Sequence, residues 1–183
     1  MNDMNEIISE YENVGEAVQK TFGNLSAEQI NWKPRADSWS VGQCLDHLIK
    51  SNQEFDPQFQ AVSSGTKKSS LWEKYSPLTS FFGNFLLKSL KNDAKKFKAP
   101  SKAIVPPSDI AADIVEQFVQ HQREVVEKIK TLENVDLQKT VVTSPFLKLM
   151  TYRLSTALEI GVEHEKRHFR QAERVMQTEG FPK

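Results

Sequence analysis

The sequence has only one cysteine among its 183 residues, Cys44, so no internal disulfide can form. A chain without disulfides agrees with a reducing compartment. Long apolar runs are also missing: no stretch approaches the eighteen or so apolar residues of a membrane span. The first fourteen residues carry acids and no apolar run of signal-peptide length. We therefore expect a cytoplasmic protein.

The chain has no excess charge of either sign, because 24 lysines and arginines balance 24 aspartates and glutamates. Nothing draws the protein as a whole to nucleic acid or to an anionic membrane, so neither is an expected partner. One local exception lies in residues 88–102. We expect a solvated linker there, with a cover over a pocket mouth or a site for an anionic cosubstrate as alternatives. Its charged residues are Lys88, Lys91, Asp93, Lys95, Lys96, Lys98 and Lys102.

No internal repeat and no alternating pattern long enough for a sheet is present. Apolar residues instead recur at helical spacing in four long segments. These are residues 5–22, 40–55, 108–132 and 152–178. The pattern predicts an all-α protein, a four-helix bundle with one long crossover connection, forming a single domain over residues 1–183. The second helix is expected to start near Ser40 and to be limited or kinked by Pro57, and Ser108 is the expected N-cap of the third.

The crossover, residues 63–108, contains an extra short helix within residues 77–90. That helix is apolar around too much of its circumference for an isolated surface helix. It must bury against the bundle or against a second chain, so a homodimer is one expectation. Its apolar residues are Phe81, Phe82, Phe85, Leu86, Leu87 and Leu90.

The last helix has an inward stripe that is apolar at both ends and polar in the middle. His164 and His168 stand four residues apart on this stripe, so both rings project in the same direction. A buried imidazole without a partner costs about 1–3 kcal/mol, which favours a shared metal ion. The alternative is two core histidines bonded to carboxylates. The stripe is formed by Leu154, Ala157, Gly161, His164, His168, Gln171 and Val175.

A catalytic metal usually takes three protein ligands and keeps one position open, so a third ligand must come from elsewhere. Only His47 and His121 remain. His47 lies beside the apolar stripe of the second helix, in line with Cys44, Ser51 and Glu54. His121 lies on the apolar stripe of the third helix, where a core histidine is the simpler interpretation and ligation the alternative.

Two segments resemble the signatures of the DinB-like superfamily of small metal-binding four-helix bundles. The first comprises Trp32-Lys33-Pro34 followed by Trp39-Ser40 and, after six residues, His47-Leu48; the second is His164-x-x-x-His168-x-x-Gln171. Order, spacing and length agree over nearly the whole chain, although residues 63–108 match no pattern. The resemblance implies a metal ion held by His47, His164 and His168.

Three neutral histidines suit a divalent cation such as Zn²⁺ or Ni²⁺ and leave room for a further ligand. Similarity to thiol S-transferases, including bacillithiol-dependent ones, implies transfer of a low-molecular-weight thiol to a small-molecule substrate. Metal-dependent hydrolysis is the next alternative. The third is a non-catalytic, stress-related protein that binds a metal or a small ligand, in which Cys44 or Glu54 would close the site.

Residues near the proposed ligands have expected roles of their own. Glu54 and Gln171 extend the two ligand lines and are candidates for orienting a ligand or a metal-bound water. The residues beside the histidine pair are expected on a solvated face. Trp32 and Trp39 are expected to pin the loop before the second helix. The solvated set is Glu163, Glu165, Lys166 and Arg167.

Overall fold

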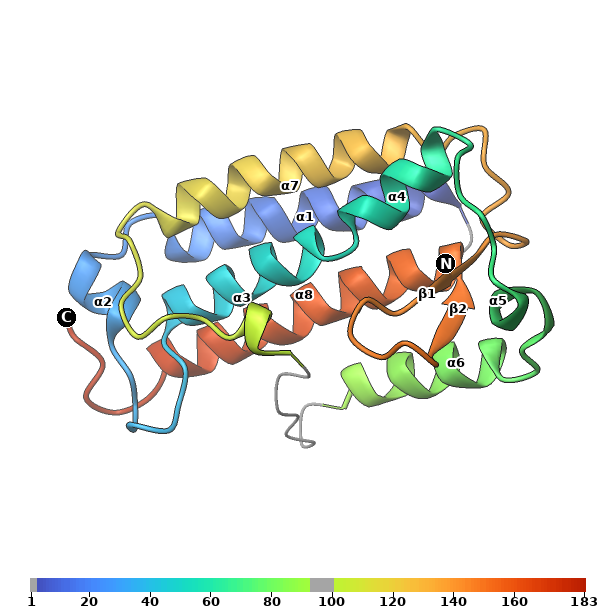
Figure 1. Cartoon of the computed structure of the whole chain (residues 1–183). Coiled ribbons are helices and arrows are strands. Elements are labelled where there is room, and N and C mark those ends of the chain that lie inside the picture. Colours follow the sequence, from blue (N-terminus) through green and yellow to red (C-terminus); the bar gives the residue numbers. More distant parts are fainter. Residues whose placement is uncertain (1–2, 93–100) are drawn as a thin grey trace.

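The computed structural model describes residues 3–92 and 101–183. Four long helices run along one another as the predicted bundle (Figure 1). They are α1 (Met4–Phe22), α3 (Val41–Gln53), α7 (Ile114–Lys130) and α8 (Leu154–Met176). The predicted all-α fold is thus confirmed, and none of the described helices has the length and apolar character to cross a membrane. The basic segment expected at residues 88–102 lies largely outside the described residues.

The connections between the long helices contain shorter elements. The crossover from α3 to α7 runs over one end and one side of the bundle, where α6 packs against α8 (Figure 1). The short elements are α2 (Ala27–Asn31), α4 (Asp56–Ser63), α5 (Leu71–Tyr75), α6 (Thr79–Leu90), the 3₁₀ turn η1 (Lys102–Ile104), β1 (Val141–Thr143) and β2 (Thr151–Arg153).

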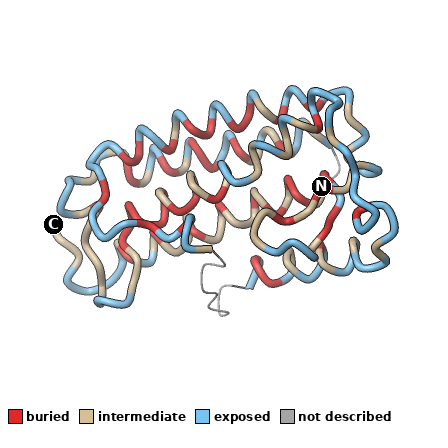
Figure 2. Tube along the Cα trace, in the orientation of Figure 1, coloured by how far each residue is buried: buried red, intermediate tan, exposed pale blue. Residues whose placement is uncertain are grey.

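The core fills the space between two pairs of helices, α1 with α7 and α3 with α8. Figure 2 shows buried residues along the facing sides of these helices and exposed residues along their outer sides. Phe22, Leu45 and Phe118 are fully buried in the largest apolar cluster, and Tyr152 and Leu154 anchor a second one. This periodic burial is what the helical spacing of apolar residues predicted.

The start of α3 is set by a reciprocal cap at Ser40, the residue near which the sequence placed the start of this helix. The Ser40 hydroxyl accepts from the Gln43 backbone N–H at 3.1 Å, and the Gln43 side-chain oxygen accepts from the Ser40 N–H at 3.2 Å. Such a capping box satisfies two backbone donors that a helix start otherwise leaves free. It thereby fixes the phase of α3 and places His47 in the second turn, on the side that faces α8.

Two predicted helix boundaries are wrong. The second helix ends at Gln53, and Pro57 lies instead in the first turn of α4, where its missing N–H costs nothing. The third helix begins at Ile114 rather than at Ser108. The Asn31 side chain holds the Ile110 backbone from both sides, with N···O distances of 2.8 Å to its N–H and its carbonyl. This contact keeps the preceding segment out of the helix.

The final helix also starts later than predicted, because Tyr152 belongs to a strand. β1 and β2 pair antiparallel, with Val142 opposite Tyr152. Each strand has only three residues, so the all-α assignment is unchanged by this ladder. Gln58 of α4 completes it by donating to the Thr143 carbonyl at 2.6 Å and accepting from its N–H at 3.2 Å. A three-residue strand is too short to show as an alternating pattern in the sequence, and the side chain that holds it comes from a residue far away in the chain.

At Gly161 the side chain of Tyr11 from α1 lies so close to α8 that there is no room for a side chain. A methyl group on Gly161 would overlap the hydroxyl of Tyr11, which is buried and donates to the Leu158 carbonyl at 3.4 Å. We expect Gly161→Ala to lower the free energy of unfolding by about 1–2 kcal/mol, since overpacking outweighs the gain in helix propensity. Urea denaturation followed by circular dichroism measures this.

Two further variants show whether the overlap is the cause. Gly15→Ala is a matched helical control, because its added methyl group would meet only Gln122 Cβ at 3.4 Å; it should be neutral or stabilising by up to about 1 kcal/mol. Tyr11→Phe removes the overlapping hydroxyl, so it should restore stability in the Gly161→Ala background. Equal losses for Gly161→Ala and Gly15→Ala would contradict the close approach.

Candidate metal centre

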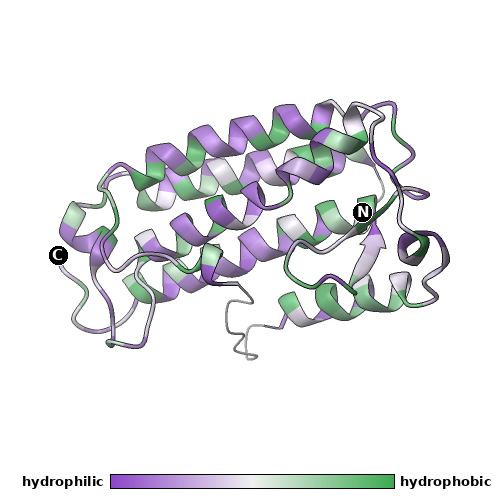
Figure 3. Cartoon of the chain, in the orientation of Figure 1, coloured by the Kyte–Doolittle hydropathy of each residue, from purple (hydrophilic) through white to green (hydrophobic). Residues whose placement is uncertain are grey.

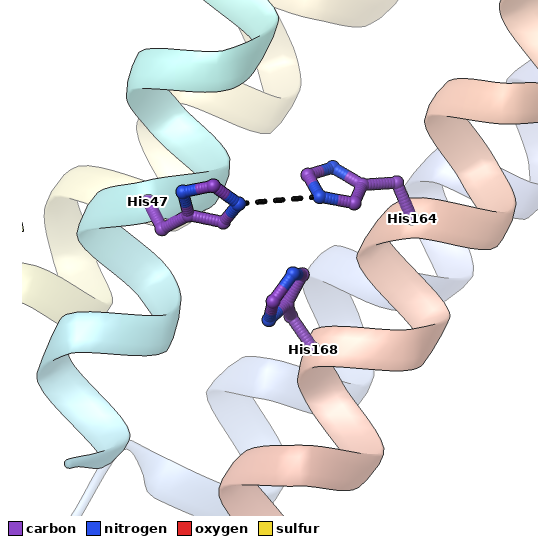
Figure 4. Close-up of side chains that lie close together, drawn as sticks. All are labelled: His47, His164 and His168. Carbon is purple, nitrogen blue, oxygen red and sulfur yellow. Dashed lines mark hydrogen bonds between the residues drawn. The ribbon is translucent and has the colours of Figure 1, made fainter. Parts of the chain in front are cut away.

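Three histidines from two neighbouring helices face one another in the middle of the bundle (Figure 4). His47 comes from α3 and is 3% exposed; His164 and His168 come from successive turns of α8, and His168 is 9% exposed. The Nε2 atoms of His47 and His164 are 3.2 Å apart, and one nitrogen from each ring falls in a group within 4.8 Å. The structure thus brings together the three residues that were predicted from the sequence to bind a metal ion.

The orientation of His47 is fixed by the backbone of η1. Its Nδ1 lies 2.7 Å from the Ile104 carbonyl oxygen, which can only accept, so Nδ1 carries the proton. The lone pair is then on Nε2, directed at His164. A backbone carbonyl behind a histidine is the usual support for a metal ligand. Bonds of 2.0–2.1 Å to a tetrahedral ion place two ligand nitrogens about 3.3 Å apart, close to the observed spacing.

His168 supplies an independent sign that the site takes a ligand. Its Nδ1 is buried and has no hydrogen-bond partner among the residues that the structure describes. The Trp39 ring stacks on it with centroids 5.6 Å apart and also contacts His47 at 4.8 Å, closing that side with apolar surface. An unsatisfied buried nitrogen costs about 1–3 kcal/mol and calls for a partner. These residues fit a divalent cation.

All three imidazoles are held in the neutral form that binds metal. Burial is the main reason: it lowers the pKa of His164 to about 3, helped by the neighbouring His47 and Arg167 charges. Burial also lowers the pKa of His168 well below its ordinary value, although a hydrogen bond with Gln171 opposes the effect. It lowers the pKa of His47 against the opposing influence of the Ile104 carbonyl. At neutral pH the rings therefore offer lone pairs rather than protons.

His121, the other candidate for third ligand, does not join this group. It is 5% exposed on α7, and its charged neighbours are Lys128, Asp56 and Glu124, which belong to α4 and α7. Burial is the main reason that its pKa is lowered. Its burial on the apolar stripe of α7 agrees with the core interpretation drawn from the sequence. Its Nε2, however, is buried without a hydrogen-bond partner among the residues that the structure describes, so this histidine is not a satisfied one.

The remaining candidate residues take different places. Gln171, half-buried on α8, lies beside His168 as the sequence suggested. Glu54 is exposed at the C-cap of α3, two helical turns beyond His47. Cys44 is buried in the apolar core, and burial raises the pKa of its thiol to about 12. Within residues 3–92 and 101–183, no cysteine or carboxylate joins the three histidines as a ligand.

Glu165 corrects the expectation of a solvated face. It is fully buried, and it accepts from the Asn52 side chain at 2.8 Å and from the Gln122 side chain at 2.7 Å. Burial is the main reason that the pKa of its carboxyl is raised to about 8, against these two bonds. The signal overlooked was spacing, since Glu165 continues a second buried stripe of α8. That stripe contains Leu158, Val162 and Ala172.

Arg167 and Trp39 also depart from their expected places. Arg167 does not point into solvent alone: its guanidinium donates to the Ser89, Leu90 and Asn92 carbonyls at the end of α6, the last at 2.8 Å. Trp39 packs on the histidine rings rather than serving only the loop before α3. Its place one residue before the Ser40 cap, and two turns before His47, was the available signal.

The family model of the DinB superfamily matches residues 10–172, which include both signature segments and all three histidines. The chain belongs to the DinB superfamily. Searches of curated proteins and of solved structures gave no significant match. The resemblance read from two short motifs therefore extends over most of this DinB-superfamily chain.

The position of Glu165 between two amide donors generates a second prediction. Glu165→Ala should lower the free energy of unfolding by about 2–4 kcal/mol, because it opens a cavity and removes the acceptor of the Asn52 amide and one of the two acceptors of the Gln122 amide. Glu163→Ala, on the partly exposed side of α8, should stay within about 0.5 kcal/mol of the parent. Chemical denaturation measures both. Equal effects of the two variants would contradict a structural role for Glu165.

Proposed function

We propose that this protein is a metal-dependent enzyme that transfers a low-molecular-weight thiol to a small electrophilic substrate. The observation that carries the proposal is the convergence of three neutral imidazoles, two buried and His164 partly buried, without a fourth ligand from the described cysteines and carboxylates. Zn²⁺ and Ni²⁺ are the ions that such a donor set suits best. The cytoplasm, where thiols stay reduced, is the expected compartment.

A divalent ion bound there acts as a Lewis acid and lowers the pKa of a thiol or water that it binds. Because the three imidazoles are uncharged, they leave the full +2 charge to attract an anion such as a thiolate. His47 stays oriented through Ile104, and the Trp39 ring excludes water from one side. The Ser51 hydroxyl, 3.5 Å from His47 Nε2, is placed to hydrogen-bond a ligand beside the histidines.

The reaction balances without a redox partner. The thiolate sulfur attacks an electrophilic carbon, a carbon–sulfur bond forms, and the leaving group departs with the electron pair of the bond that breaks. The thiol proton passes to solvent. Gln171 is a neutral amide and cannot act as a base, so its candidate role is to orient His168 or the ligand. Glu54, exposed at the end of α3, would act through solvent rather than by contact.

The two alternatives from the sequence remain distinguishable. A hydrolase would use the same three histidines with water in place of the thiol. A structural metal site usually closes with four protein ligands, which the described cysteines and carboxylates do not provide, so the open arrangement favours reactivity over a purely structural staple.

The metal site itself can be tested by elemental analysis of purified protein. We expect close to one divalent ion per chain, and His47→Ala, His164→Ala and His168→Ala should each lose most of it. His121→Ala is the matched control: it removes a buried histidine outside the group and should keep the ion, with at most a 10- to 100-fold lower affinity. Loss of the ion in His121→Ala with retention in His47→Ala would refute this ligand set.

The thiol preference has a separate spectroscopic test. In protein substituted with Co²⁺, an added thiol should produce a sulfur-to-metal charge-transfer band, and its affinity should rise as the pH approaches the pKa of the thiol. Metal-free protein should show neither effect. A loaded protein that ignores thiols between about pH 6 and 9 but hydrolyses esters or amides would make water the nucleophile and replace transferase by hydrolase.

A further inference from the structure

Large apolar side chains are exposed together at one end of the bundle. Leu71 is 76%, Tyr75 77% and Leu149 72% exposed. Within residues 3–92 and 101–183, Val105 is the only exposed large hydrophobic residue that lies outside this surface. We call this surface the α5–α6 face; it consists of Leu71, Trp72, Tyr75, Leu78, Phe81, Phe85, Leu147 and Leu149, from α5, the first half of α6 and the β1–β2 loop.

The three segments of the α5–α6 face are held to one another. Trp72 Nε1 donates to the Leu149 carbonyl at 2.9 Å, which ties α5 to the β1–β2 loop. The hydroxyls of Thr79 and Thr151 lie 3.0 Å apart and tie the start of α6 to β2. Figure 3 shows α6 as mainly hydrophobic along its length, in contrast to the mixed colouring of the long helices. The segments that carry the exposed apolar residues are therefore tied to one another by hydrogen bonds.

The same face carries positive charge without exposed acids. Lysines stand among the apolar residues: Lys74 beside Tyr75, Lys88 one turn beyond Phe85, and Lys148 between two exposed leucines. The only acid in residues 64–92 and 144–150 is Glu73. Glu73 is buried and accepts hydrogen bonds from Lys67, Ser70 and Thr143 at 2.9 Å each. Its charge is thus turned inward.

We propose that the α5–α6 face binds peripherally to an anionic membrane surface. Tryptophan, tyrosine and phenylalanine favour the interface between headgroups and acyl chains, while lysines reach anionic headgroups. A second copy of this chain is the competing occupant, since the sequence predicted a homodimer through residues 77–90. A twofold contact would place lysine-bearing surfaces against each other with no exposed acid to pair them, whereas anionic lipid complements them.

This inference departs from the expectation, drawn from net charge, that no membrane is a partner. Net charge is a sum over the whole chain, and a total of +0 does not exclude a local excess of lysine such as that in residues 64–92 and 144–150. The attraction of juxtamembrane lysines depends on charge within about a Debye length of the lipid, so the local distribution decides it. Binding of this kind needs no membrane-spanning helix.

The experiment is co-sedimentation of the full chain with phosphatidylcholine vesicles that contain about one third phosphatidylglycerol. We expect binding to these vesicles, much weaker binding to pure phosphatidylcholine, and loss in high salt. Leu149→Gln should weaken binding about tenfold or more, because its apolar side chain no longer enters the interface. Lys148→Gln should weaken binding about fivefold.

Lys20→Gln, an exposed lysine at the far end of α1, is the matched control and should bind as the parent does. His164→Ala should also bind normally, so the result is independent of the proposed enzyme function. Absence of sedimentation with anionic vesicles, or equal binding to neutral ones, would overturn the proposal. So would a dimer in light scattering that Leu149→Gln dissociates while no vesicle binding occurs, since the face would then belong to a second copy.

Discussion

The organisation of this bundle depends on the need of three buried imidazole lone pairs for a common partner. α3 and α8 bring His47, His164 and His168 together where solvent hardly reaches. Burial lowers the pKa of the three rings, so they are uncharged at neutral pH and do not repel one another as cations. The Ile104 carbonyl stands behind His47, whereas Nδ1 of His168 has no partner among the residues that the structure describes, so His168 gains most from a shared ion. The fold thus prepares a ligand set rather than a conventional apolar core.

Neighbouring residues of α8 serve opposite sides of that helix. His164 turns toward α3 and the metal centre, while Glu165 turns about 100° away into a buried network with Asn52 and Gln122. Gln122 also donates to the Tyr11 carbonyl at 3.2 Å, which joins α1, α3, α7 and α8 through polar contacts. Such a network penalises slippage of any helix, because a shift would leave a buried polar group unpaired. It therefore keeps the ligand-bearing turns in register.

The candidate metal centre and the α5–α6 face differ in charge. The metal centre is lined by neutral rings in the middle of the bundle, whereas exposed lysines and aromatic residues gather at the α5–α6 face. A total charge of +0 describes neither region. The two sites also differ in what holds them: the first rests on helix packing, and the second on hydrogen bonds between short segments, such as that from Trp72 to Leu149.

The sequence alone determined the four amphipathic helices and the histidine pair of the last one, because periodicity and i,i+4 spacing are local signals, and the resemblance of two motifs added His47. Only the tertiary structure decided the rest. Asn31 holds Ile110 out of α7, and Gln58 completes a ladder with Thr143, through contacts between residues far apart in the chain. The burial of Glu165 likewise depends on two amide side chains from other helices, because a carboxylate is stable in a core only when hydrogen-bond donors are present there.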